Sequence, residues 1–380
     1  MEWLSRAAYA GMFVFGIVMA LLGAVLPLIA RRVGFDLGEA GNLFFVMNLC
    51  QLASVLGLGW LTDRFGKRLP FVGGAFLVAA AVALVAVARE YSALVLAIAL
   101  LGVGGGALNG STNALISDLH DDPKRKNAAL NLLGVFFGIG ALFLPFTIGA
   151  LLESLGLELI LMAAATLAAG AGLFYLLLKF PPPARREGVP LAEVGLLARN
   201  PLVLALGFLL FFQSGNEFIL GGYATSFLTT DSKVSDSAAS YLLAGYWGSI
   251  MLARVFLSRF LLKAKGSTAV LISATVAAIG VITLVSGSGV WGAALGLVLI
   301  GVGFASIFPT TLGAAGARFA GRSGTVFGIL IAIALSGGMT LPWLVGHLAR
   351  DYGLRWALLV AVFNCLMIFG LQLAVRKKAN

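Results

Sequence analysis

The sequence predicts an all-α polytopic membrane protein, with twelve transmembrane helices in two pseudo-symmetric six-helix bundles. Hydrophobic residues make up 60% of the 380 residues and charged residues only 11%, and the mean hydropathy is +1.01. Apolar runs of about 20 residues, the length that crosses a hydrocarbon core of about 30 Å, follow one another along the chain. This composition excludes a water-soluble globular protein, because water cannot solvate so much apolar surface.

Charge clusters, together with glycine and proline residues, mark the ends of the spans. The first run contains Pro27 and lacks a small-residue cleavage site, so it is interpreted as a retained span and not as a secretory signal. The spans are predicted at residues 7–30, 40–61, 69–88, 93–117, 128–152, 157–179, 201–229, 237–258, 267–286, 290–314, 323–346 and 355–375. An even number of spans places both ends of the chain on one side of the membrane.

The distribution of lysine and arginine predicts the orientation. Of the 26 basic residues, nineteen fall in connections on the side of the two termini and six in connections on the other side. Basic residues are retained on the cytoplasmic side during insertion. Both termini are therefore predicted to be cytoplasmic, in the inner (plasma) membrane. The formal net charge of +10 is then explained without a nucleic-acid partner.

A proline-rich, basic connection divides the spans into six and six. We predict an N-terminal half at residues 1–179, a cytoplasmic linker at 180–200 and a C-terminal half at 201–380. Many transporters are duplicated in this way, so the two halves were compared by sliding one along the other.

The halves align at a nearly constant separation. Residues 102–104 in the fourth span read GVG and recur as residues 301–303 in the tenth, an offset of 199. Residues 144–145 in the fifth span read LP and recur as residues 341–342 in the eleventh, an offset of 197. Two independent matches predict an internal duplication.

The connection after the second span carries the most specific motif. Residues 59–68 read GWLTDRFGKR, which resembles the G-x-x-x-D-R-x-G-R/K-R/K loop of the major facilitator superfamily. The resemblance implies the two-bundle fold of that superfamily and solute transport by alternating access. An aspartate beside basic residues at a helix end can dock a neighbouring helix terminus, so we expect a conformational latch. Its residues are Gly59, Asp63, Arg64, Gly66, Lys67 and Arg68.

Two charged residues, Glu217 and Arg254, remain inside the predicted spans. A carboxylate at membrane depth costs at least about 2.5 kcal/mol, so Glu217 is predicted to exchange a proton, with a structural hydrogen bond as the alternative. Arg254 is aligned with Gly59 and Ser258 with Asp63, so the second copy of the latch lacks its acid. Arg254 is interpreted as a gate residue or as a side chain that snorkels to the inner face. Counted from the cytoplasmic span ends, the two charges lie about 18 Å apart along the helices, so direct pairing is not expected.

Uncharged polar and aromatic side chains gather in several spans and predict the solute site. Amides and aromatic faces suit a polyhydroxylated, uncharged ligand such as a sugar. For any one of these side chains, a hydrogen bond between helices is the alternative. The predicted substrate-binding residues are Asn109, Asn113, Gln213, Asn216, Tyr246, Trp247, Asn131, Gln51 and Phe308.

The seventh span carries a second resemblance. Residues 211–222 read FFQSGNEFILGG, which is similar to the F-x-x-x-G-x-E-x-x-x-G-G/W pattern of the fucose/proton symporter branch. The resemblance implies a transporter that moves a small solute, such as a sugar, together with H⁺ across the lipid bilayer. Members of that branch have polar or acidic residues in the first and fourth spans, whereas this sequence has no embedded acid there. Proton coupling would therefore depend on Glu217.

Other functions stay open. A proton-coupled exporter of drugs or lipophilic compounds is one alternative, although the fourth span lacks the arginine that many such proteins have. A non-transporting membrane receptor is another. An enzyme is not expected, because His120 and His347 lie at opposite faces and no phosphate-binding loop occurs. No cofactor or metal is predicted, Cys50 and Cys365 suit small apolar positions, and a monomer is expected.

Overall fold

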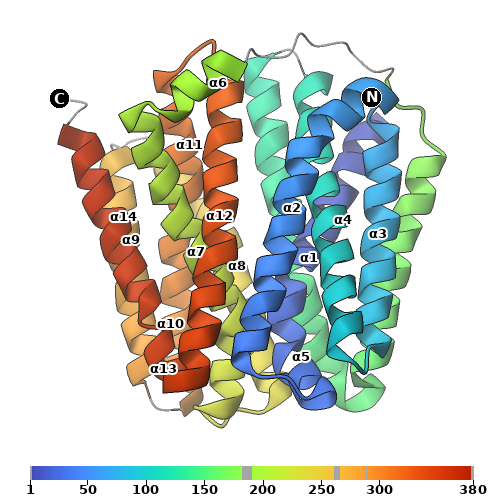
Figure 1. Ribbon diagram of the computed structural model, residues 1–380, viewed down its shortest axis with the longest axis vertical. Coiled ribbons are helices and arrows are strands. Elements are labelled where there is room, and N and C mark those ends of the chain that lie inside the picture. Colours follow the sequence, from blue (N-terminus) through green and yellow to red (C-terminus); the bar gives the residue numbers. More distant parts are fainter. Residues whose placement is uncertain (1, 121, 182–190, 261–265, 288, 378–380) are drawn as a thin grey trace. The chain divides into compact units, whose positions relative to one another are not determined.

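The computed structural model describes residues 2–120, 122–181, 191–260, 266–287 and 289–377, and these ranges are predominantly helical (Figure 1). The helices of the described residues are α1 Glu2–Val33, α2 Leu37–Phe65, α3 Arg68–Val87, α4 Tyr91–Leu119, α5 Pro123–Leu176, α6 Leu191–Ala198, α7 Pro201–Thr230, α8 Asp236–Phe260, α9 Gly266–Ser286, α10 Gly289–Phe304, α11 Ile307–Arg318, α12 Ser323–Tyr352, α13 Leu354–Ala357 and α14 Val360–Lys377.

Each predicted span coincides with a helix, part of a helix or a pair of helices. The long α5 supplies both the fifth and the sixth span, because Gly156 adopts a φ of 72° and turns the chain there. The tenth span is divided into α10 and α11, and the twelfth into α13 and α14. Within the described residues, ten stretches are long and apolar enough to cross a bilayer. One of these is α5, with its two spans, and the more polar α8 is not among the ten. The protein is therefore a multi-pass membrane protein of the predicted all-α class.

Contacts group the chain into two compact units. Unit 1 consists of Met1–Phe35, Val46–Arg186 and Asp236–Ala244, and unit 2 consists of Asp36–Phe45, Glu187–Ser235 and Gly245–Asn380. The first turns of α2 thus belong to unit 2, and those of α8 to unit 1. Residues 182–190 of the predicted linker lie outside the described residues, and α6 follows them. The division into halves at 1–179 and 201–380 stays a prediction.

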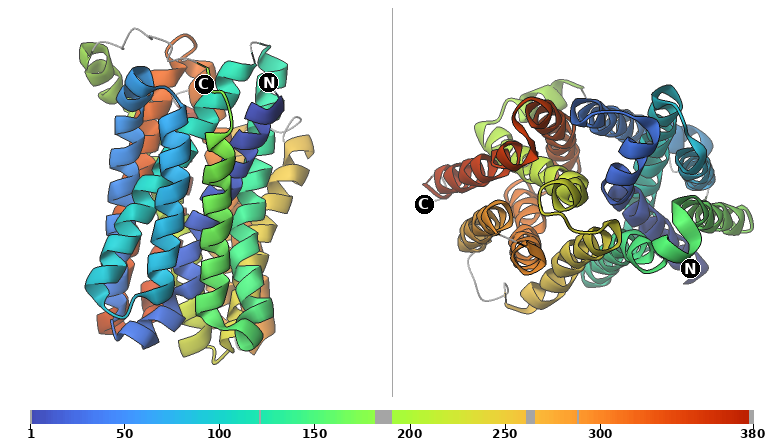
Figure 2. Two further views of the ribbon diagram at one scale, coloured as in Figure 1. Left: turned by 90° about the vertical axis from the view of Figure 1, so that its right-hand side faces the viewer. Right: turned by 90° about the horizontal axis from the view of Figure 1, so that it is seen from below.

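Equivalent close contacts of glycine residues occur in both copies of the internal repeat. In unit 1, a Cβ atom on Gly140 of α5 would collide with the carbonyl oxygen of Phe13 in α1. In unit 2, a Cβ atom on Gly337 of α12 would collide with the carbonyl oxygen of Phe211 in α7. Small residues allow membrane helices to approach this closely, and the helices of each unit run nearly parallel in the end-on view of Figure 2. The predicted duplication is thus present in the helix packing.

A second pair of glycine contacts fixes the register of the repeat. Gly102 of α4 packs against the backbone of Met47 in α2, and Gly301 of α10 packs against the backbone of Tyr246 in α8. Both the glycines and their partners are separated by 199 residues. The two contacts are therefore the same contact in the two copies.

This register corrects one sequence alignment. With an offset of 199, Arg254 corresponds to Val55, and not to Gly59 as the comparison of the loops predicted. The loop comparison was wrong because the loop has diverged between the copies, whereas the glycine contacts are maintained by packing.

Candidate functional site

The candidate site is built on one face of α7. The side chain of Asn200 caps the first turn of this helix and Pro201 occupies its start, a favourable beginning for a helix. Gln213, Glu217 and Gly221 follow at intervals of four residues, so they lie along one side of the helix. This face is directed toward residues of α8, all within unit 2.

Glu217 lies at the centre of this face, with 14% of its side chain exposed. The amide nitrogen of Gln213 donates a hydrogen bond to Oε1 of Glu217 at 3.0 Å. The Nη2 atom of Arg254 in α8 lies 3.8 Å from the same oxygen, and 28% of the arginine side chain is exposed. The two intramembrane charges therefore form an ion pair that is slightly too long for a direct hydrogen bond.

This pair corrects the expectation that Glu217 and Arg254 are too far apart. The expectation measured height from the ends of α7 and α8 that lie farthest from the connection between them, and these helices have 30 and 25 residues. Measured instead from the connection between them, the two Cα atoms differ in height by roughly 8 Å. In addition, Cα–Cβ bonds tilt toward the N-terminus of each helix, so the two side chains of these antiparallel helices tilt toward each other.

Arg254 also contacts a break in a helix. The first segment, α10, ends at Phe304 and α11 begins at Ile307. Pro309 has no backbone N–H and cannot donate to the carbonyl four residues earlier, which belongs to Ala305. The Nε atom of Arg254 donates to that carbonyl oxygen at 3.2 Å. The arginine therefore links the carboxylate of α7 to the broken helix α10–α11.

Two buried polar atoms beside the ion pair have no partner among the described residues. These are the hydroxyl oxygen of Tyr246, which is fully buried, and Oε1 of Gln213. The ring of Tyr246 and that of Trp247 approach Gly221, at 3.7 and 3.0 Å from the position of a Cβ atom there. Buried polar groups are normally hydrogen-bonded, so these two atoms point to a ligand, such as a water or a solute hydroxyl.

Asn216 lies on a different face of α7 and contacts α14. Its Nδ2 atom donates to the carbonyl of Ala361 at 3.2 Å and to the sulfur of Cys365 at 3.4 Å. Its Oδ1 atom accepts a hydrogen bond from Asn364 at 2.8 Å. These contacts match the alternative that sequence analysis left open for each amide, a hydrogen bond between helices.

The other predicted solute contacts are distributed over both units. In unit 1, Gln51 is buried and its Oε1 atom has no partner among the described residues. The amide of Asn113 donates back to the carbonyl and side-chain oxygens of Asn109, one turn earlier in α4, at 2.9 and 3.1 Å. Asn131 is exposed on α5. Phe308, in unit 2, is half-buried next to the proline of α11.

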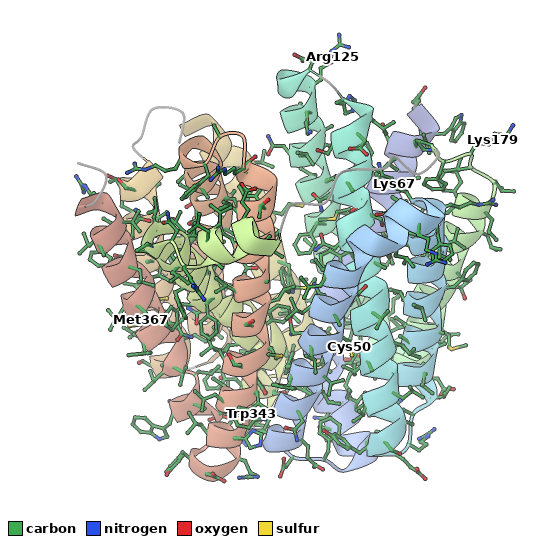
Figure 3. The ribbon with its side chains drawn as sticks, turned by 45° about the horizontal axis from the view of Figure 1, so that its top comes forward. Cys50, Lys67, Arg125, Lys179, Trp343 and Met367 are labelled. Carbon is green, nitrogen blue, oxygen red and sulfur yellow. The ribbon has the colours of Figure 1, made fainter. Side chains whose placement is uncertain are left out.

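The predicted latch occupies one end of unit 1. Gly66 has a φ of 75° and allows the tight turn between α2 and α3. Lys67, labelled in Figure 3, forms an ion pair with Asp118 at the end of α4. Arg68 donates from Nη2 to the carbonyl of Leu176, the last residue of α5, at 2.8 Å. Basic side chains thus bind the C-terminal ends of two neighbouring helices, where the helix dipole favours cations.

The remaining latch residues are only partly described. The guanidinium carbon of Arg64 lies 5.6 Å from the ring centroid of Phe65. Gly59 and Asp63 belong to α2, but their side chains lie outside the described residues. Their contribution to the latch stays a prediction.

Sequence analysis missed three features of the site: the Ala305 carbonyl, the proline that frees it and Asn364. A proline inside a long apolar run was the one signal available, since it removes a specific backbone hydrogen bond. Nothing in the sequence indicates which helix takes up the freed carbonyl. That information appears only when the helices are packed.

Comparisons with known proteins identify the family of the chain and several relatives. The sequence model of the Major Facilitator Superfamily matches residues 8–216. The chain is 30% identical over 209 residues to the multidrug resistance protein MdtG of Escherichia coli, for example of strain K12 / DH10B and strain SE11. That match covers 52% of this chain and 50% of the relative, so the chain spans about half the length of the curated relatives it matches.

Two solved structures of transporters have the same fold as this chain. The chain is similar to the nucleoside transporter NupG, with a TM-score of 0.82 and coverage of 98% of this chain and 99% of that chain. It is also similar to a bacterial homologue of the human lysosomal transporter Spinster, with a TM-score of 0.79 and coverage of 99% and 97%. Both are 15% identical in sequence, so they support the fold and not a substrate.

Proposed function

The chain belongs to the Major Facilitator Superfamily, and we propose that it is a secondary active transporter that moves a small polar solute by alternating access, coupled to protons. Membership in this superfamily supports transport and not enzymatic catalysis. We further propose an inner-membrane location with both termini cytoplasmic, as the distribution of basic residues indicates. We expect the working form to be a monomer.

The proposal rests on one observation, the ionisable group of Glu217 inside α7. Its ionised form is balanced by Arg254 at 3.8 Å and by the amide of Gln213. Adding a proton removes that balance and changes the net charge of the cluster by one. A proton can drive a conformational change only if the two conformations bind it with different affinity. This site can meet that requirement, because protonation of Glu217 removes the ionic partner of Arg254 and leaves the arginine with its other contact.

The break between α10 and α11 provides the element that responds. When Glu217 is protonated, Arg254 loses its ionic partner and keeps the carbonyl of Ala305. When Glu217 is ionised, the two acceptors share the guanidinium group. Pro309 leaves this carbonyl without a donor in its own helix. The hydrogen bond from Arg254 therefore stabilises the backbone at the break between α10 and α11. Proton binding would thus be transmitted from α7 to α10–α11 through one side chain.

A sugar is the solute that we propose first. The Tyr246 hydroxyl can donate or accept a hydrogen bond and Oε1 of Gln213 can accept one, so both atoms can bind hydroxyl groups of a solute. Trp247 supplies an aromatic face beside them. This agrees with the resemblance to the fucose/proton symporter branch. Asn109, Asn113, Asn131, Gln51 and Phe308 stay candidate contacts, whereas the hydrogen bonds of Asn216 to α14 support a structural role for that side chain.

A proton-coupled exporter of drugs or lipophilic compounds is the second candidate. It is favoured by the similarity to MdtG, which is named as a multidrug resistance protein. The same carboxylate would serve it, since an antiporter also needs a group that binds protons. The two candidates differ in the solute and in the direction of flux relative to the proton.

Reconstituted protein distinguishes them. Proteoliposomes would be tested with labelled hexoses and with lipophilic cations, with and without a proton gradient, for the wild type and for Glu217→Gln. We expect hexose accumulation driven by an inward proton gradient, lost in Glu217→Gln, while exchange of hexose persists.

The matched control is Glu193→Gln, which removes an ion-paired carboxylate of α6 that lies 2.9 Å from Arg322 and is 32% exposed. This control should accumulate hexose normally. Gradient-driven accumulation that survives Glu217→Gln would contradict the proton role. Movement of lipophilic cations against the proton flow, without hexose transport, would establish the exporter.

A further inference from the structure

An apolar groove of about 410 Å³ lies within unit 1, between α2, α3 and α4. Its walls include Leu58 and Leu61 of α2, Leu69 and Leu77 of α3, and Val103 of α4. The one hydroxyl group in the lining donates a hydrogen bond to the Val103 carbonyl at 2.9 Å. Every polar side chain in the groove is therefore satisfied, and the groove offers a ligand only apolar contact.

Two glycines create the groove. A Cβ atom on Gly57 of α2 or on Gly73 of α3 would meet no other atom within 4 Å. In the register of the repeat, these positions correspond to Phe256 and Ile272 of unit 2. Unit 2 thus has large apolar side chains, each 60% exposed, at the positions where unit 1 has glycine.

The dimensions of the groove suit one acyl chain. From Leu69 to Leu77 the groove extends along eight residues of α3, or roughly 12 Å. One leaflet contributes about 15 Å to a hydrocarbon core of about 30 Å. A single chain would therefore fill the groove over most of the depth of one leaflet.

The end of the groove at Leu69 adjoins basic residues. Arg64 and Arg68 are exposed, and Lys67, which lies between them in the sequence, is labelled in Figure 3. Lys67 forms an ion pair there with Asp118, at the end of α4. Arg68 uses one nitrogen for the end of α5, and a guanidinium group has five N–H donors.

We propose that this groove binds one acyl chain of an anionic phospholipid, with the phosphate group against Arg64 and Arg68. The apolar lining binds the chain, and guanidinium groups bind phosphate through charge and paired hydrogen bonds. The lipid would belong to the leaflet on the side of the α2–α3 connection. It would join the latch, whose basic residues already bind the ends of α4 and α5.

Photolabelling in nanodiscs tests the proposal. The probe is phosphatidylglycerol with a photoreactive acyl chain, compared with phosphatidylcholine that carries the same chain, and labelled peptides are mapped by mass spectrometry. We expect phosphatidylglycerol to label peptides of α2 and α3 in the wild type. The variants Gly57→Phe and Gly73→Ile introduce the side chains that unit 2 has. Each should lower this labelling about tenfold, the effect of displacing roughly two methylene groups.

Two controls keep the test specific. Gly170→Ile changes a glycine of α5 that also has no atom within 4 Å of a Cβ position, and it should label as the wild type does. Arg64→Gln should lower labelling by phosphatidylglycerol and leave that by phosphatidylcholine unchanged. Equal labelling by the two lipids, unchanged labelling in both groove variants, or a groove labelled by a lipophilic drug analogue and not by lipid would overturn the proposal.

Discussion

The two copies of the repeat share a framework and differ in chemistry. Glycine contacts of the same kind hold α1 to α5 in unit 1 and α7 to α12 in unit 2. In the register of these contacts, Glu217 corresponds to Met19 and Arg254 to Val55. The ion pair thus replaces an apolar pair at equivalent positions. The duplicated packing shapes the fold, and the candidate coupling site occurs in one copy only.

The helix break follows the same division. At the positions that correspond to Ala305 and Pro309, unit 1 has Gly106 and Gly110, and α4 continues without interruption from Tyr91 to Leu119. An unbroken helix has no freed carbonyl for an arginine to bind. The three unusual features of unit 2, the carboxylate, the arginine and the break, therefore occur together.

The largest effect is expected from breaking the ion pair on one side. In Arg254→Val, Glu217 keeps its charge without a partner, and the free energy of unfolding should fall by about 2.5–3.5 kcal/mol. The double variant Glu217→Met/Arg254→Val reproduces the residues of unit 1 and should return to within about 1 kcal/mol of the wild type. Reversible unfolding in mixed detergent micelles with increasing SDS measures both values.

The exposed ion pair of Glu193 and Arg322 is the control, and Arg322→Gln should cost less than about 1 kcal/mol. If the double variant is as unstable as the single variant, the apolar pair of unit 1 does not restore stability, and unit 2 needs more than an apolar replacement. In either case the double variant should transport no solute against its gradient.

The next largest effect is expected at the two equivalent glycine contacts, one in each unit. Gly140→Ala and Gly337→Ala each force a methyl group onto a carbonyl oxygen of the neighbouring helix, and each should lower the free energy of unfolding by about 1–3 kcal/mol. At Gly134 and Gly328 a Cβ atom would meet nothing within 4 Å. Gly134→Ala and Gly328→Ala should therefore raise the free energy of unfolding by about 0.5–1 kcal/mol. A cost confined to one unit would contradict the equivalence of the two contacts.

A smaller effect is expected from restoring the backbone donor at the break between α10 and α11. In Pro309→Ala the backbone N–H can donate to the carbonyl of Ala305, so that Arg254 loses exclusive use of this acceptor. Proton-driven accumulation should fall about tenfold, the equivalent of one hydrogen bond to a charged group, while the free energy of unfolding rises slightly. The ratio of accumulation to exchange is the measurement.

Pro145→Ala, in α5 of unit 1, removes a proline that lies inside a helix without affecting the break. It should leave this ratio unchanged. A similar fall in both variants would mean that any loss of a proline, and not the acceptor of Arg254, impairs coupling.

The sequence predicted the spans well, because runs of apolar residues and the charges between them are sufficient to locate helices in a membrane. It placed Glu217 correctly as an embedded acid, since an ionisable group stands out in an apolar run. It did not predict the partner of that acid, because the relative height of α7 and α8 depends on helix lengths and tilts. Nor did it separate Gln213 from Asn216, because the side chains of α7 from 218 to 228 are buried whatever their direction and no hydrophobic stripe marks its faces.

The smallest predicted effect concerns those two amides. Asn216→Leu and Asn364→Leu each remove the hydrogen bond of 2.8 Å between these two side chains of α7 and α14. A double-mutant cycle should give a coupling free energy of about 0.6 kcal/mol, the average for polar contacts between membrane helices. Gln213→Leu removes a side chain whose Oε1 atom has no partner among the described residues. It should therefore raise the KM of solute exchange, whereas Asn216→Leu leaves the KM unchanged. A raised KM in Asn216→Leu together with an unchanged KM in Gln213→Leu would move the solute from the α8 face of α7 to the α14 face.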